Sequence, residues 1–103
     1  MSFDDDDDAL PTAPRAVHLL IHGRVQGVGY RAWLAEEATR FGLAGWARNL
    51  LSGEVEAVLY GPENVVEAIV VACRTGPLGA RVDGIVESET AERPTGFRVR
   101  GTA

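Results

Sequence analysis

The stretch Gly23-Arg24-Val25-Gln26-Gly27-Val28-Gly29-Tyr30-Arg31 separates an apolar run that ends at Ile21 from a helix-like pattern that begins at Tyr30. Its glycines permit backbone angles that other residues avoid, and the missing Cβ lets a ligand approach the main chain. In such a turn, successive N–H groups and the N-terminus of the following helix attract an anion. Arg31 can set its planar guanidinium against phosphate oxygens. The stretch therefore predicts a strand-to-helix loop that cradles a phosphate or a carboxylate.

The residues before this loop alternate in polarity, which is typical of a half-buried strand. Val17, Leu19 and Ile21 share one face, and His18 and His22 lie on the other. His22 is either an acid–base group beside the loop or a solvent-facing strand position. Because the sequence places no carboxylate or second ligand beside it, we predict that His22 faces solvent.

The rest of the chain predicts two helices and four further strands. Apolar residues recur at helical spacing in two segments, which Gly42 and Gly76-Pro77 terminate, and Ser52-Gly53 marks a tight turn between two strands. We expect helices over 30–41 and between Gly61-Pro62 and Gly76, and strands over 45–51, 54–60, 82–89 and 97–100. The order βαββαβ, followed by a short strand, predicts a ferredoxin-like α/β sandwich (α+β) with both helices on one face of an antiparallel sheet.

Length and charge indicate one small domain with an acidic N-terminal extension. The chain has 103 residues and a net charge of −5, of which −4 falls within residues 1–16 and −1 within the remainder. The run Asp4–Asp8 and the nearby prolines predict a disordered tail over residues 1–16. A folded and nearly neutral domain then follows over residues 17–103.

Cysteine usage and hydropathy bear on the compartment. Cys73 is the one cysteine, so neither an intrachain disulfide nor a Cys/His zinc spacing is possible, and its place in an apolar helical stripe predicts a buried thiol rather than a nucleophile. No apolar run approaches the roughly 18 residues of a membrane span. The N-terminus lacks the basic and apolar regions of a secretory signal. We therefore predict a cytoplasmic protein that binds no metal and no membrane.

The loop also matches a nucleotide-binding pattern, which has to be weighed. Gly27 to Ala32 formally fits the dinucleotide fingerprint G-x-G-x-x-[G/A]. That fingerprint needs a parallel βαβ unit and an acidic residue about 20 positions later, whereas position 49 is Asn49 and Glu54 lies beyond a hairpin turn. A Walker A loop needs a lysine, and the chain contains none. We therefore expect no nucleotide fold.

An RNA-binding role is the other alternative, because RNA-binding modules use the same fold class. Such modules need exposed aromatic side chains on the sheet and a basic surface. The third strand instead carries Glu54 and Glu56. Four arginines either form a small basic patch or are merely scattered over the surface: Arg24, Arg48, Arg98 and Arg100. We adopt the second interpretation and predict no nucleic-acid binding.

Two long motifs together make the sequence similar to the acylphosphatase family. The first is the loop Gly23–Arg31, and the second is Gly42-Leu43-Ala44-Gly45-Trp46-Ala47-Arg48-Asn49. Ser52–Glu56 and Gly76-Pro77 stand where later motifs of the family fall, so the resemblance extends over roughly residues 16–100. It implies the ferredoxin-like fold and the hydrolysis of acyl phosphates to a carboxylate and inorganic phosphate, without a cofactor.

The resemblance also implies the roles of individual residues. Arg31 and Asn49 correspond to the family's catalytic arginine and asparagine. The family's phosphate cradle, made of main-chain N–H groups, corresponds to five residues: Gln26, Gly27, Val28, Gly29 and Tyr30. The sequence departs from the family pattern at Ala47, Ser52 and Ala72, where packing and turn chemistry are affected rather than the two catalytic positions.

These observations lead to a specific functional hypothesis. The loop and Arg31 would hold the phosphoryl group of a small acyl phosphate, and Asn49 would orient the attacking water. We expect a monomer whose ligands are the acyl phosphate and its product, inorganic phosphate. The alternative is a catalytically silent module that binds anions or acyl phosphates and regulates a partner.

Overall fold

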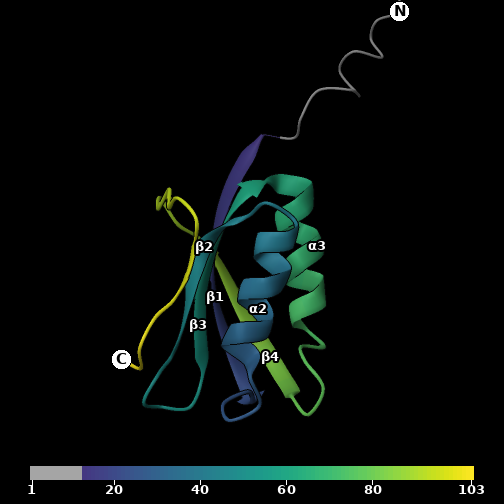
Figure 1. Ribbon diagram of the computed structural model, residues 1–103, viewed down its shortest axis with the longest axis vertical. Coiled ribbons are helices and arrows are strands. Elements are labelled where there is room, and N and C mark those ends of the chain that lie inside the picture. The colour runs from purple at the N-terminus through teal and green to yellow at the C-terminus, as the bar shows by residue number, and fades with distance from the viewer. Residues whose placement is uncertain (1–12) are drawn as a thin grey trace, which may run out of the picture.

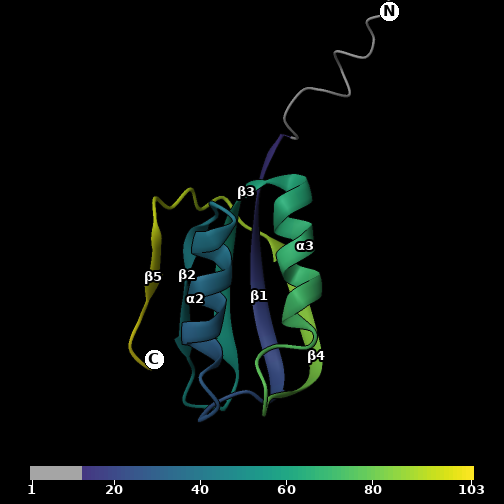
Figure 2. The same ribbon diagram turned by 45° about the vertical axis from the view of Figure 1, so that its right-hand side comes forward.

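The computed structural model of the chain describes residues 13–103 (Figure 1). The strands and helices follow one another in this order: β1 (Pro14–Arg24), α2 (Tyr30–Arg40), β2 (Ala44–Asn49), β3 (Val55–Pro62), α3 (Glu63–Cys73), β4 (Arg81–Glu89) and β5 (Phe97–Val99). The five strands form one sheet in the order β4-β1-β3-β2-β5. Both helices cover the same face of this sheet (Figure 2). The predicted ferredoxin-like arrangement is therefore confirmed.

The sheet is antiparallel in its first four strands and parallel at one edge. β1 pairs antiparallel with β3 and β4, and β2 pairs antiparallel with β3. β5 pairs parallel with β2, so the sheet is mixed and the expectation of a purely antiparallel sheet was too narrow. The reason is topological. Residues 90–96 lead the chain from the end of β4 to the end of the sheet where β2 begins, so β5 runs in the same direction as β2.

The core lies between the sheet and the two helices. The alternation in β1 buries Val17, Leu19 and Ile21 completely on the helix-covered face. Leu34 of α2 and Val66 of α3 pack onto the same cluster. Each such side chain contributes about 1.5–3 kcal/mol when it leaves water, so the two helices are held mainly by this apolar layer.

Strand β1 begins earlier than the sequence predicted. Pro14 pairs with Pro62, which places the start of the strand within the segment expected to be a tail. Proline is tolerated at the first position of a strand, and Arg15 binds Glu89 at 2.9 Å and Glu87 at 3.3 Å across the β1–β4 pair. Strand β1 therefore starts three residues before the expected domain boundary at residue 17. The aspartate run Asp4–Asp8 lies outside the described residues.

Two helix ends also differ from expectation. α3 begins at Glu63, and Pro62 is its N-cap rather than its first residue. α2 ends at Arg40, so Phe41 leaves the apolar stripe and its side chain is 53% exposed. Gly42, with a φ of 77°, turns the chain in the left-handed conformation that commonly terminates a helix.

Candidate active site

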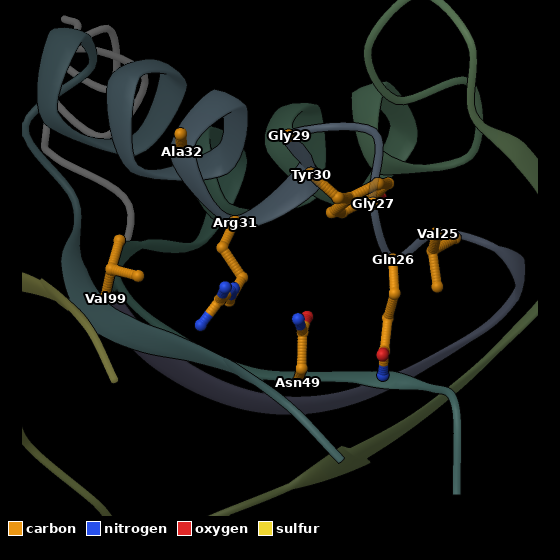
Figure 3. Close-up of a pocket in the computed structure, with 9 residues that line it drawn as sticks. All are labelled: Val25, Gln26, Gly27, Gly29, Tyr30, Arg31, Ala32, Asn49 and Val99. Carbon is orange, nitrogen blue, oxygen red and sulfur yellow. The ribbon is translucent and has the colours of Figure 1, made fainter. Parts of the chain in front are cut away.

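A pocket of about 210 Å³ lies at the end of the sheet where β1 passes into α2 (Figure 3). Three separate parts of the chain line it, namely the loop before α2 together with the first turn of that helix, the end of β2, and the strand β5. The lining residues are Val25, Gln26, Gly27, Gly29, Tyr30, Arg31, Ala32, Asn49 and Val99. The pocket is large enough to hold a phosphoryl group.

The loop owes its shape to two glycines in the left-handed conformation. Gly27 has a φ of 77° and Gly29 a φ of 79°, a region that L-residues with a Cβ enter at a cost of about 1–2 kcal/mol. Gly29 is the N-cap of α2, and its carbonyl accepts the first helical hydrogen bond from Trp33 N at 3.0 Å. The N–H groups of the first turn have no acceptor within the helix, so this end of α2 presents positive partial charges beside the pocket.

The side chain of Tyr30 anchors the loop to the protein interior. It is 1% exposed, and its hydroxyl donates to the carbonyl of Cys73 at 2.6 Å. Burial, with a smaller effect of neighbouring Cys73, raises the pKa of this hydroxyl well above its ordinary value, so it stays protonated and donates. Gly76 packs so closely on the ring that a Cβ there would lie 2.6 Å from a ring carbon. The main chain of Tyr30 is thus fixed from behind.

Arg31 carries the positive charge of the pocket. Its Nη1 donates to the carbonyl of Arg100 at 2.8 Å, just beyond β5. Within residues 13–103 its guanidinium forms no ion pair with a carboxylate. Its remaining N–H groups and its full charge are therefore available to an anion in the pocket.

Asn49 is the last residue of β2, and its side chain faces the loop across the pocket from below (Figure 3). Its backbone carbonyl accepts a hydrogen bond from Ala103 N at 3.0 Å, and Leu51 N donates to the Ala103 carbonyl at 2.9 Å. The end of β2 is therefore tied to the C-terminal segment. An amide at this position can donate one hydrogen bond and accept another, which suits the alignment of a water molecule.

The side chain of Gln26 does not point at a ligand but bridges two parts of the chain. Its amide nitrogen donates to the carbonyl of Leu50 at 2.8 Å and to that of Glu54 at 2.9 Å. Both acceptors belong to the turn that joins β2 to β3. The sequence predicted only a main-chain role for Gln26. Every residue type has a backbone carbonyl, so the sequence does not indicate which carbonyls accept a hydrogen bond from this side chain.

The structure brings most of the predicted site residues to one pocket. Arg31 and Asn49 line it together with every predicted cradle residue except Val28, whose side chain packs against the core instead. Three lining residues were missed: Val25, Ala32 and Val99. Val25 lies within the loop motif and Ala32 directly follows it, whereas Val99 reaches the pocket only through the pairing of β5 with β2, for which the sequence holds no signal.

The histidines and the cysteine lie elsewhere. His18 and His22 occupy the sheet face opposite the helices, where His18 Nε2 is 2.6 Å from Glu56 and His22 Nδ1 is 3.5 Å from Glu54. Cys73 is fully buried, as predicted, and burial raises the pKa of its thiol to about 12. None of these groups lines the pocket.

The part of the chain that the structure describes contains neither a metal-ligand cluster nor a membrane-spanning helix. Residues 13–103 contain no cluster of three or more histidine, cysteine, aspartate or glutamate side chains suited to a metal ion. Within the same range, no helix combines the length and the apolar character needed to cross a membrane.

Comparison with known proteins shows which proteins this chain is similar to. A profile of the family described as Acylphosphatase matches residues 17–99. An acylphosphatase of Azorhizobium caulinodans is 56% identical over 89 residues, which cover 84% of this chain and 95% of the relative. The structure of an acylphosphatase from Coxiella burnetii matches with a TM-score of 0.81 at 32% identity, over 84% of this chain and 93% of the other. Full-length HypF, solved in a phosphate- and nucleotide-bound form, matches with a TM-score of 0.81 at 25% identity, over 90% of this chain but 12% of HypF.

Proposed function

The chain belongs to the acylphosphatase family and hydrolyses the carboxyl–phosphate bond of small acyl phosphates, and on this premise we propose that Arg31 and Asn49 are its catalytic residues. The observation that carries the proposal is that both side chains line one pocket with the glycine loop. The loop connects β1 to α2, whereas Asn49 is the last residue of β2. Their convergence on one pocket that is large enough for a phosphoryl group supports a shared role.

In this proposal the loop and Arg31 hold the phosphoryl group. The main-chain N–H groups of residues 26–30 and the guanidinium of Arg31 donate to its three oxygens. Charge on those oxygens changes as the phosphoryl group passes from carboxylate to water, and donors that are already in place stabilise it without reorganising. The hydrogen bond from Arg31 to the Arg100 carbonyl supports this role, because it holds the guanidinium in position before substrate arrives.

Asn49 orients the attacking water. Its amide has too little basicity to remove a proton, so its contribution is alignment of the water opposite the departing carboxylate. A phosphate oxygen of the substrate accepts the proton of the water. The departing carboxylate, with a pKa near that of side-chain acids at about 4, needs no proton from the protein. The proposed reaction therefore uses no metal ion and no cofactor.

The decisive experiment compares two asparagines. We expect Asn49→Ala to lower kcat for benzoyl phosphate by about 10²–10³-fold, the usual effect of removing one oriented polar partner, while inorganic phosphate still inhibits competitively with an unchanged constant. Asn64→Ala makes the same chemical change at an exposed position of α3 and should leave kcat unaltered. Wild-type turnover by Asn49→Ala would overturn the assignment. Activity of the wild-type protein should persist in excess EDTA.

A second function is favoured by one comparison. The domain recurs as 12% of the HypF chain, so this fold also exists as a part of a larger protein. A catalytically silent module would bind inorganic phosphate or benzoyl phosphate without turning it over. The same assay separates the two functions, because binding without hydrolysis by the wild-type protein supports the module alone.

The proposal includes a monomeric protein of the cytoplasm. The single cysteine is a buried free thiol, which suits a reducing compartment. Light scattering coupled to size-exclusion chromatography should give a mass close to 11.0 kDa, the mass of one chain.

A further inference from the structure

We infer that Gln26 is a positioning residue, whose side chain sets the place of Asn49 relative to the phosphate-binding loop. This inference rests on the proposed role of Asn49. Gln26 belongs to the loop, and its side chain extends from the loop to the level of Asn49 (Figure 3). Its two acceptors, the carbonyls of Leu50 and Glu54, close the turn between β2 and β3. Leu50 follows Asn49 directly in the chain. The side chain therefore ties one wall of the pocket to the other.

The two carbonyls that Gln26 contacts also form the closing hydrogen bonds of the turn. Leu50 N donates to the Glu54 carbonyl at 2.9 Å, and Gly53 N donates to the Leu50 carbonyl at 3.0 Å. A carbonyl oxygen has two lone pairs, so Gln26 fills the second acceptor site of each. The amide of Gln26 thus binds the base of the turn without competing with its internal hydrogen bonds.

The side chains at the tip of the turn do not pack against the rest of the protein, so the turn is held by hydrogen bonds. Leu51, Ser52 and Gly53 are exposed, and Leu51 is 88% exposed. On the outer side, the hydrogen bonds between Ala103 and the backbone of Asn49 and Leu51 secure the strand. On the side that faces the pocket, Gln26 connects the turn to the phosphate-binding loop. The end of β2 is consequently held between the C-terminal segment and the phosphate-binding loop.

Gln26 acts through Asn49 rather than on the substrate. Both donor positions of its amide nitrogen are taken by carbonyls, so they are not available to phosphate oxygens. The loss of these bonds would let the end of β2 move away from the loop, and a misplacement of about 1 Å in a reacting group commonly costs 10²-fold in rate. We therefore expect loss of Gln26 to reduce turnover more than phosphate binding.

The first test replaces the amide side chain by apolar side chains that cannot donate a hydrogen bond. Gln26→Leu should lower kcat for benzoyl phosphate about 10- to 100-fold, with the inhibition constant of inorganic phosphate within twofold of wild type. Gln26→Met provides the same test if the leucine variant does not fold, which thermal unfolding reports. Ser52→Ala is the matched control: it removes an exposed contact to Glu54 in the same turn and should change neither constant. A parallel rise in the inhibition constant and fall in kcat would instead show that Gln26 supports the cradle, and would overturn the inference.

The second test is a double-mutant cycle, which a merely structural role would not satisfy. In an Asn49→Ala background, Gln26→Leu should change kcat by less than twofold, because the residue through which it acts is gone. Equal losses in both backgrounds would overturn the inference while leaving the proposed role of Asn49 intact. If Asn49→Ala alone has no effect, the proposed function of Asn49 fails, and the inference fails with it.

Discussion

The molecule has two polar regions of opposite character, on either side of β2. The first is the open-face cluster, made of His18, Arg48 and Glu56 on the sheet face that the helices leave uncovered. The second is the pocket, where Arg31 and Asn49 face the glycine loop. Judged by residue types alone, the open-face cluster looks more like an acid–base catalytic site than the pocket does.

The difference lies in how the polar groups are used. Both oxygens of Glu56 are taken, one by Arg48 Nε at 2.6 Å and the other by His18 Nε2 at 2.6 Å. In the pocket, Arg31 donates to a neutral carbonyl and keeps its charge free for a ligand. A cluster whose charges satisfy one another is structural, whereas a binding site leaves donors directed at open space.

Arg100 links the two regions. Its guanidinium lies 4.3 Å from the ring centroid of Trp46 on the open face, and its carbonyl accepts the hydrogen bond from Arg31 beside the pocket. The indole N–H of Trp46 donates to Glu92 at 2.9 Å, so this aromatic ring is covered by charged side chains. With 4% of the residue exposed, Trp46 offers no stacking surface to a nucleotide base.

The largest expected effect distinguishes two arginines, Arg31 in the pocket and Arg48 in the open-face cluster. Arg31→Ala should lower kcat/KM for benzoyl phosphate by about 10³-fold or more, because it removes the one charged partner of the phosphoryl oxygens. Arg48→Ala removes an equally large cation from the open-face cluster and should leave kcat/KM within twofold. Steady-state kinetics on both purified variants measures the contrast. Comparable losses of activity would mean that the open-face cluster takes part in the reaction.

A smaller effect compares two tyrosines, one behind the pocket and one on the open face. Tyr30→Phe leaves the Cys73 carbonyl without its donor in a buried place and should destabilise the protein by about 1–2 kcal/mol. Tyr60, whose ring lies beside Arg93, makes no side-chain hydrogen bond within the described range, so Tyr60→Phe should cost less than about 0.5 kcal/mol. Urea unfolding of the two variants tests this difference. Equal midpoints would refute the anchoring role of the Tyr30 hydroxyl.

The smallest expected effect concerns the pH dependence of the open-face cluster. Burial raises the pKa of Glu56, but the hydrogen bonds from His18 and Arg48 outweigh it, and the folded-state pKa lies below the ordinary 4.5. The resulting stabilisation is present above about pH 4.5 and is lost as the pH falls through the folded-state pKa. Glu56→Gln should therefore cost about 0.5–1 kcal/mol at pH 7 and progressively less in acid.

Urea unfolding of wild type and Glu56→Gln from pH 7 down to pH 3 measures this convergence. Activity at pH 7 should remain unchanged in the variant, because Glu56 does not line the pocket. A stability difference that grows as the pH falls would contradict the assigned direction of the shift.

Much of the fold could be predicted from local patterns. The alternation over residues 17–21 and the helical spacing after Tyr30 indicate which face of each element is buried. Such a pattern can be recognised from neighbouring positions in the chain. The strand ends were less predictable. β1 extends back to Pro14 because β3 supplies pairing partners as far as Pro62, and those partners lie 48 positions away in the sequence.

For the candidate site, the loop and its arginine were predictable from residue types. Three glycines before a helical pattern permit the tight turn of the loop, and Arg31 is the cation at the end of the motif. Asn49 entered through family resemblance, since an asparagine at the end of a strand carries no chemical signature of its own. Nothing in the sequence indicated that Val99 or the carbonyl of Arg100 would join the site.

By itself, then, the sequence determined the order of the elements, the glycine loop that shapes the cradle and the cation that ends it, because each depends on residue type and on spacing along the chain. The tertiary structure decided which polar groups are left free. It paired Glu56 with His18 and Arg48, brought Asn49 opposite the loop, and directed Gln26 to two main-chain carbonyls. Every residue has a backbone carbonyl, so only the path of the chain through space selects the ones that hold a site together.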